Sequence, residues 1–350
     1  MKGPLVRRVS TIAVAGISTA ALAFTLTACG ESSTDSGGSG GGKGVGLAFD
    51  VGGRDDHSFN ESAARGLDKA EKELGIKSKM MTAKNGETEA EREQRLSSLA
   101  DKGYNPVIGV GFNYAKSIEK VAKDFPKTNF AIVDSVVQGP NINSITFGEH
   151  EGSYLAGAAA ALKSKTGKVG FIGGVDNELI KKFQAGFEQG AKETNPKVEV
   201  TSEYLGSTDK GFNDPAAAKD KAKGMLDRDI DVIYTAAGLS GNGSIEAVAG
   251  KKDAWAIGVD SDQYQQPGLE KYKDHILTSV VKNVDVAVFD MIKSVKDGKP
   301  LTGPHQYLLK DGGVSLATSG GFIDDIKAKI EEAKKNIVDG KVVVKSTVKS

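Results

Sequence analysis

Residues 45–74, VGLAFDVGGRDDHSFNESAARGLDKAEKEL, contain the unit that decides the fold. The first five residues are an apolar run of the kind that forms a buried strand, and a polar loop containing glycine follows it. Apolar residues then recur at spacings of three and four: Phe59, Ala63, Leu67, Ala70 and Leu74. This spacing places them on one face of a helix, so the stretch predicts the strand and helix of a βαβ unit.

The same alternation continues along the rest of the chain. Apolar runs predict further strands at residues 77–81, 107–110, 130–133, 169–172, 198–204, 232–235 and 255–259. Helices are predicted between them at residues 88–99, 115–125, 178–193, 214–228 and 244–249, and the first of these opens with the capping box Thr88-x-x-Glu91. Strands that alternate with helices join as right-handed βαβ units, which predicts an α/β fold with parallel sheets.

The order of these elements indicates two similar lobes. A later strand at 276–281 and a helix at 284–295 would most easily join the first lobe. The first lobe is therefore expected to contain residues 44–146 and about 278–306, and the second residues 147–277 and about 307–350. A chain that crosses between lobes more than once makes a hinge, and a cleft over a hinge suits a protein that closes on a ligand.

Composition excludes several classes of function. The 350 residues include 46 Lys and Arg, 46 Asp and Glu, four His and one Cys. A net charge of zero argues against a nucleic-acid binder, which needs a basic surface, and one Cys allows no internal disulfide and no Cys-x-x-Cys site. The His residues lack the i, i+4 metal-binding spacing, and the sequence has no phosphate-binding loop and no nucleophile elbow. We expect no metal, no cofactor and no enzymatic activity.

The N-terminal segment predicts export and attachment to a membrane. Basic residues and then a charge-free apolar stretch give residues 1–28 the pattern of a signal peptide, although a membrane-spanning anchor of about 20 residues would begin in the same way. The stretch ends in Leu26-Thr27-Ala28-Cys29-Gly30, which resembles the lipobox of bacterial lipoproteins, where the Cys is lipidated. Cys29 is the only Cys of the chain, so we expect it to carry the lipid.

Residues 29–43 are rich in Gly and Ser and are predicted to be a flexible tether, with an end-to-end distance of about 20 Å. Removal of the signal peptide takes away Lys2, Arg7 and Arg8 and leaves 43 basic and 46 acidic residues. The mature chain is then mildly acidic, which disfavours attachment to anionic lipid by charge. We expect a body held at the extracellular face of the bacterial cell membrane through lipid on Cys29.

Polar residues gather where the predicted strands end. In open parallel sheets, ligands bind beyond the carboxyl ends of the strands. Four of these ends carry acids or glycine turns, beginning at Asp50, Asp134, Gly238 and Asp260. Ordinary turn chemistry explains any one of them, and Ser58-x-x-Glu61 in the first loop also fits a capping box. Together they predict a cleft of carboxylates, amides and backbone N–H groups that suits a neutral, hydroxyl-rich ligand.

Longer motifs run through the whole body: Asp50-Val-Gly-Gly with Asp56-x-Ser-Phe-Asn60, Ala131-Ile-Val-Asp134, Glu151-Gly-Ser-Tyr-Leu-Ala-Gly157, Lys168-Val-Gly-Phe-Ile-Gly-Gly174, Lys182-Phe-x-Ala-Gly-Phe187, Gly211-Phe-Asn-Asp-Pro215, Ala237-Gly-Leu-Ser-Gly-Asn-Gly243, Ala256-Ile-Gly-Val-Asp-Ser-Asp-Gln263 and Leu277-Thr-Ser-Val-Val-Lys282. Together they resemble the basic membrane protein family, the PnrA-like nucleoside-binding lipoproteins of ABC importers. The resemblance implies the type I periplasmic-binding-protein fold, in which two doubly wound parallel-sheet lobes are joined by a multi-crossing hinge.

The resemblance also implies roles for residues at the base end of a bound nucleoside. Phe59 and Phe212, one from each lobe, would hold a purine ring between them, because aromatic rings stack on bases. Asp134 would accept hydrogen bonds from the edge of the base, and Asn60 would add an amide. Phe59 also begins an apolar helix face and could instead belong to the core.

At the sugar end, the resemblance implies that Asp260 would accept hydrogen bonds from two ribose hydroxyls and that Gly238 would let the backbone approach the sugar. Lys282 would reach a ribose oxygen while balancing the carboxylates, although it could also be a surface charge. Asp50 would brace the first loop or touch the ligand.

We therefore expect a non-enzymatic receptor that captures a nucleoside, with a purine favoured, and delivers it to ABC permease subunits. Two alternatives would use the same cleft: a binding protein for a free sugar or other small polar solute, and an extracellular sensor. A calcium-dependent nucleoside hydrolase fits less well, because Gly52 stands where the middle acid of its Asp cluster would be.

Overall fold

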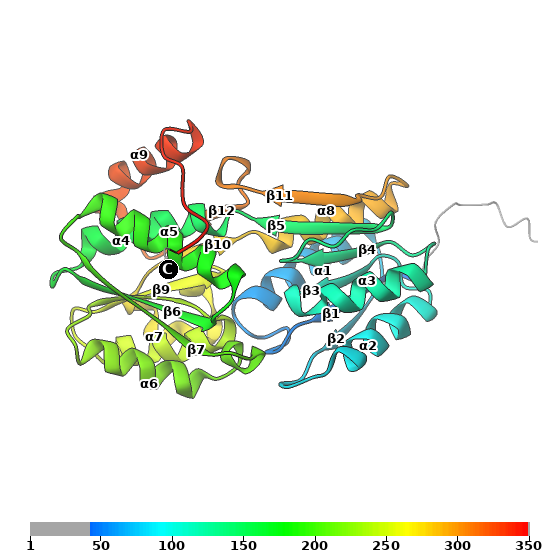
Figure 1. The fold of residues 1–350 in the computed structure, drawn as a ribbon, viewed down its shortest axis with the longest axis horizontal. Coiled ribbons are helices and arrows are strands. Elements are labelled where there is room, and N and C mark those ends of the chain that lie inside the picture. The colour runs from blue at the N-terminus through cyan, green and yellow to red at the C-terminus, as the bar shows by residue number, and fades with distance from the viewer. Residues whose placement is uncertain (1–42, 349–350) are drawn as a thin grey trace, which may run out of the picture. The chain divides into compact units, whose positions relative to one another are not determined.

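The computed structural model describes residues 43–348. The predicted signal peptide, Cys29 and nearly all of the predicted tether lie outside these residues and stay predictions. The described residues belong to one compact unit and form two sheets covered by helices (Figure 1). Within this described part, no helix combines the length and the apolar character that a membrane crossing requires.

The first sheet has six parallel strands in the order β11-β5-β4-β3-β1-β2. In chain order they are β1 (Val45–Phe49), β2 (Ser78–Thr82), β3 (Val107–Val110), β4 (Phe130–Val133), β5 (Ile142–Phe147) and β11 (Gly303–Tyr307). The three central strands β1, β3 and β4 are buried along their whole length, as continuous apolar runs in a parallel sheet covered on both faces should be.

The second sheet repeats this plan in the order β12-β10-β9-β8-β6-β7. Its strands are β6 (Lys168–Val175), β7 (Glu199–Gly206), β8 (Val232–Ala236), β9 (Trp255–Asp260), β10 (Ile276–Lys282) and β12 (Val314–Leu316). All neighbours run parallel except β12, which pairs antiparallel with β10 at the edge. The predicted α/β fold with two doubly wound parallel sheets is confirmed.

A pair of helices covers each face of each sheet. On the first sheet, α1 (Phe59–Leu74) packs with α8 (Val284–Lys296), and α2 (Glu89–Asp101) packs with α3 (Ala115–Asp124). On the second, α4 (Glu149–Lys163) packs with α5 (Glu178–Thr194), and α6 (Pro215–Leu226) packs with α7 (Gly241–Ala249). The last helix, α9 (Lys327–Val338), lies against α4. The apolar cores are thus on the sheet faces, and the strand ends are left for polar residues.

The chain passes between the sheets after β5, after β10 and after β11. The prediction that the strand near 276–281 would join the first lobe was wrong, because β10 pairs in parallel with β9 of the second sheet. This pairing covers an edge of β9 that would otherwise be open, while β5 and β11 complete the first sheet. Helix α8 does pack on α1, so this crossing falls at Asn283 rather than near residue 278.

Helix α2 begins with the predicted capping box. The Thr88 hydroxyl accepts a hydrogen bond from the Glu91 backbone N–H at 3.3 Å, and the Glu91 carboxylate accepts from the Thr88 N–H at 2.8 Å. These two bonds satisfy two of the backbone donors that a helix N-terminus leaves free, so this local prediction is confirmed.

Helix α1 begins differently from the prediction. The Ser58 side chain makes no capping bond, because its hydroxyl donates to the Asp260 carboxylate at 2.6 Å instead. The Asp56 carboxylate takes over and accepts from the backbone N–H groups of Ser58, Asn60 and Glu61 at 2.9, 2.9 and 3.0 Å. Capping by Asp56, two residues before Ser58, thus frees the Ser58 hydroxyl to reach the other lobe.

Replacing Asp56 by Ala should lower the free energy of unfolding by about 3 kcal/mol, because three buried or half-buried N–H donors lose their acceptor. Thr88→Ala is the matched control: it removes an exposed cap and should cost about 1 kcal/mol. Urea denaturation of both variants measures the difference, and equal losses would contradict this account of how α1 begins.

Candidate functional site

A pocket lies at the carboxyl ends of the strands and is lined by residues of both lobes. The space inside it, with the open mouth included, is about 560 Å³. All eight residues predicted to contact a ligand line it: Asp50, Phe59, Asn60, Asp134, Phe212, Gly238, Asp260 and Lys282. The first four come from the first lobe and the last four from the second, while their roles toward a ligand stay predictions.

The loop after β1 is braced by Asn60. The Asn60 amide oxygen accepts from the Asp50 backbone N–H at 3.0 Å, and its amide nitrogen donates to the Val51 carbonyl and to the Asp56 carboxylate, both at 3.0 Å. Both N–H groups of this amide are therefore used inside the protein, and only its oxygen keeps a lone pair for a ligand. Asn60 thus shapes the loop that carries the pocket carboxylates.

Two carboxyls of this loop are strongly affected by burial. Burial raises the pKa of Asp50 to about 6, although the Val51 backbone N–H opposes the shift. Burial raises the pKa of Asp56 to about 7, against the backbone N–H groups of Asn60, Glu61 and Ser58. Both groups therefore change charge near neutral pH.

Lys282, the last residue of β10, is the cation of the pocket. Its Nζ lies 2.6 Å from Oδ2 of Asp134 in the first lobe and 3.4 Å from Oε1 of Glu149 at the start of α4. Only 2% of the residue is exposed, so the suggestion that it is a surface charge was wrong. Burial lowers its pKa, but Asp134 and Glu149 outweigh this effect and hold the pKa above its ordinary value.

Three aromatic rings enclose the same ammonium group. Its Nζ lies 5.0, 5.1 and 5.7 Å from the ring centroids of Phe59, Phe147 and Phe183. Such cation–π contacts favour a desolvated ammonium. Phe59 lines the pocket and also packs against the first-lobe core, while its stacking on a base stays a prediction.

Left-handed backbone turns three strand ends toward the pocket. Asp134, directly after β4, has φ +70°, and Asp260, at the end of β9, has φ +64°. Gly238 has φ +54° shortly after β8. Residues other than Gly rarely adopt this conformation, and such strain collects at functional sites. The left-handed backbone sets the direction in which the Asp134 and Asp260 side chains leave their strand ends.

Asp260 joins the two lobes. Its Oδ2 accepts from the Ser58 hydroxyl at 2.6 Å, while the Ser261 hydroxyl donates to the Ser58 carbonyl at 2.8 Å. Burial raises the pKa of Asp260, although Lys282 and the Ser58 hydroxyl oppose the shift. One oxygen of this carboxylate is held by the protein, and the residue lines the pocket.

Several pocket residues were not predicted. Phe112, which follows β3, meets Phe212 edge-on with ring centroids 6.2 Å apart, and Leu179, Ile180 and Phe183 come from one face of α5. The strand-end rule would have found Phe112. The α5 residues could not be found in this way, because they do not follow a strand and because an apolar helix face usually packs in a core.

The side chains that line the pocket are suited to binding a small molecule. No group of three or more His, Cys, Asp or Glu residues that could hold a metal occurs among residues 43–348. The pocket combines aromatic and aliphatic surface with four Asp side chains and one Lys. This arrangement suits a ligand with a flat apolar part and several hydrogen-bond donors.

A family model and individual relatives place the chain in the same family. The family model for ABC transporter substrate-binding proteins of the PnrA-like type matches residues 43–347. The chain is 38% identical over 315 residues to the ABC transporter nucleoside-binding protein BmpA of Lactococcus lactis, covering 86% of this chain and 88% of that protein. It is 31% identical over 305 residues to Basic membrane protein A of Borreliella burgdorferi, covering 85% and 86% of the two chains.

A solved structure has the same fold. The solute-binding protein of an ABC transporter system from Aeropyrum pernix superposes with a TM-score of 0.76 at 28% sequence identity. The match covers 87% of this chain and 94% of the Aeropyrum protein, and therefore includes both lobes.

Proposed function

The chain belongs to the PnrA-like family of ABC transporter substrate-binding proteins, and from this premise we propose that it captures a nucleoside, with a purine favoured, and delivers it to a membrane permease. The observation that carries the proposal is the pocket itself, which has aromatic rings and buried carboxylates from both lobes on one cavity. Its role is that of a binding protein without enzymatic activity.

At the base end, Phe59 and Phe212 provide apolar faces from opposite lobes. A base stacked on an aromatic ring gains about 1–3 kcal/mol, so a flat heterocycle benefits from both. Asp134 lies beside them and would accept hydrogen bonds from N–H groups at the edge of the base. Its bond to Lys282 occupies only part of its capacity, because a carboxylate has about four lone-pair sites.

At the sugar end, Asp260 would accept hydrogen bonds from ribose hydroxyls. The Ser58 hydroxyl orients this carboxylate, and Gly238 allows close approach of the backbone. Lys282 would donate to a ribose oxygen from its place between carboxylates. Since each lobe supplies only part of the contacts, a ligand that touches both stabilises the closed arrangement.

The charge of the pocket favours a nucleoside over a nucleotide. Four lining residues are Asp, and the one Lys is already paired with a carboxylate. A phosphate would add negative charge beside buried carboxylates with no unpaired Lys or Arg among the lining residues to receive it. We propose that this imbalance excludes phosphorylated ligands.

The place of action that we propose is the outer face of the cell membrane, with the chain attached through lipid on Cys29. The lipobox-like sequence before this residue supports the proposal, and so does the mild acidity of the mature chain, which disfavours attachment by charge. Attachment would keep the receptor beside its permease.

Calorimetry on residues 43–350 with guanosine, adenosine, inosine, uridine and ribose tests the ligand class. We expect nucleosides to bind more tightly than ribose, and Phe59→Ala and Asp260→Asn each to weaken binding about tenfold or more. Phe322→Ala is the control, because this ring packs on Trp255 away from the pocket. Ribose binding as tightly as the nucleosides would overturn the proposal in favour of a sugar receptor.

Nucleoside binding should weaken on acidification, and the loss should begin at a higher pH than an ordinary Asp would give. Ribose hydroxyls donate to ionised carboxylate, and burial raises the pKa of Asp260, so the ionised form is lost at a higher pH than for an ordinary Asp. In Asp260→Asn, which cannot lose this charge, the affinity for the nucleoside should depend less on pH than in the wild type. Affinity that stays constant or rises on acidification would contradict the role assigned to Asp260.

The lipid attachment is tested in cells grown with an alkyne-labelled fatty acid. Wild-type protein should carry the label, Cys29→Ser should not, and Ser32→Ala in the same segment should keep it. Label on the Cys29→Ser protein would show that lipid is attached to another residue and would overturn the role proposed for Cys29.

A further inference from the structure

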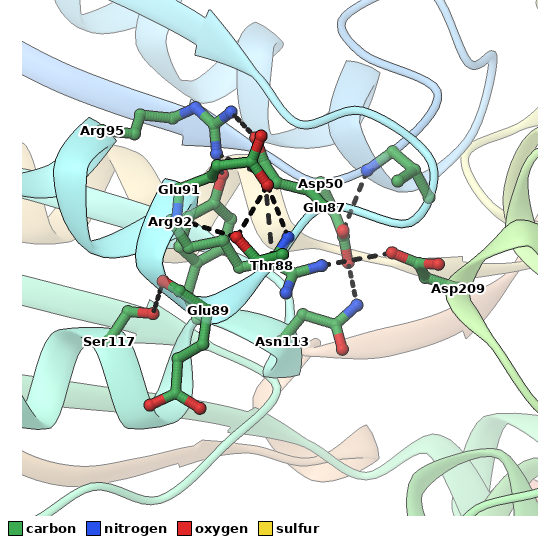
Figure 2. A network of polar contacts seen from close by, with 12 residues as sticks. Asp50, Glu87, Thr88, Glu89, Glu91, Arg92, Arg95, Asn113, Ser117 and Asp209 are labelled. Atoms are coloured by element: carbon green, nitrogen blue, oxygen red, sulfur yellow. Dashed lines mark hydrogen bonds and ion pairs between the residues drawn. The ribbon is translucent and has the colours of Figure 1, made fainter.

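The turn that carries Phe212 is held to the first lobe by a contact outside the pocket. The short helix η2 (Asp209–Phe212) follows β7, and Nη2 of Arg92 in α2 donates to Oδ2 of Asp209 at 3.2 Å. Figure 2 shows this pair joined across two elements of different lobes, beside Asp50 and Asn113. Neither Arg92 nor Asp209 lines the pocket.

Two further contacts join the same turn to the first lobe. The ring of Phe212 meets the ring of Phe112 at a centroid distance of 6.2 Å and an angle of 70°. Next to it, the Asn213 amide donates to the Asn85 side chain at 3.2 Å. An ion pair, a ring contact and an amide bond thus converge on one short segment of the second lobe.

The ion pair and the amide bond lie near the edges of the sheets opposite the crossings. The crossings follow β5, β10 and β11, which lie at or next to one edge of each sheet, whereas β2 and β7 form the other edges (Figure 1). Five strand spacings of about 4.8 Å separate the two edges by about 24 Å. Opening by about 10° at the hinge would then separate the far edges by about 4 Å, which is enough to break an ion pair.

Contacts inside the first lobe fix the position of the Arg92 side chain. The Arg95 guanidinium, three residues along α2, bonds to the Glu87 carboxylate, to the Tyr114 hydroxyl at 3.0 Å and to the Thr82 carbonyl at 3.2 Å. Nε of Arg92 lies 3.9 Å from the same Glu87 carboxylate. The start of α2 is therefore fixed, and the Arg92 and Asp209 side chains are only 10% and 11% exposed, so solvent screens their attraction little.

We propose that Arg92 and Asp209 are positioning residues that form a latch: they hold the far edges of the lobes together and fix the Phe212 turn over the ligand. The latch acts through Phe212 and makes no contact with the ligand. Its effect on ligand binding rests on the proposed function, but its effect on closure does not.

The first test measures binding kinetics on residues 43–350 by surface plasmon resonance with guanosine and adenosine. Arg92→Ala and Asp209→Ala should each raise the dissociation rate about fivefold to tenfold and change the association rate less than about twofold. The double variant should resemble the single variants, because removing either partner removes the whole latch. Lys221→Ala is the matched control, since it breaks an ion pair with Glu203 inside the second lobe.

The second test needs no ligand. The only Cys of the chain precedes residue 43, so spin labels can be placed at Lys79→Cys on β2 and Lys223→Cys on α6, two exposed positions in different lobes. Pulsed electron paramagnetic resonance then gives the distribution of distances between the lobes. We expect Arg92→Ala to shift this distribution toward longer distances and Lys221→Ala to leave it unchanged.

The two tests separate the two proposals. If wild-type protein binds no nucleoside, the proposed function fails. The distances between the spin labels then still show whether Arg92 and Asp209 hold the lobes together. If the distances are the same in wild type and Arg92→Ala, or if the effects of the two single variants on dissociation add in the double variant, the latch is wrong whatever the protein binds.

Discussion

The ion pair between Lys282 and Asp134 is the interaction on which the rest of the site depends. Lys282 ends β10 directly before a crossing, and Asp134 follows β4 in the other lobe, so one buried pair joins the lobes beside the hinge. A buried charge that loses its partner costs about 3–5 kcal/mol. The arrangement of the lobes, the packing of Phe59 and the charge left in the pocket therefore all depend on this pair.

The pocket contains carboxylates because both sheets bring the carboxyl ends of parallel strands to it, while helices cover their faces. The side chains that gather there also support each other. Asp56 caps α1, which frees Ser58 to orient Asp260. The same residues thus begin a helix, join the lobes and shape the pocket, so the stability of α1 and the shape of the pocket are coupled in this first loop.

The alternation of strands and helices could be predicted, because central strands buried on both faces are continuous apolar runs. Strand β5 could not be predicted in this way, because it contains the buried polar residues Asn143 and Ser144. Their side chains are hydrogen-bonded to His305 and to the Val137 backbone N–H, which lie outside the strand. The eight predicted pocket residues follow strand ends or family motifs. Glu149 has neither signal: it looks like an ordinary acid in a first helical turn, and only the packing shows that it is buried beside Lys282.

The matching strand orders of the two sheets make the halves of the body structural duplicates. In this correspondence β4 matches β9, so Asp134 and Asp260, both in left-handed backbone, occupy equivalent positions. A pair of equivalent carboxylates cannot by itself tell one end of a ligand from the other. The sense in which an unsymmetrical molecule lies in the pocket must come from positions where the duplicates differ, and Lys282 is one of them, because β5, the counterpart of β10, ends in Phe147.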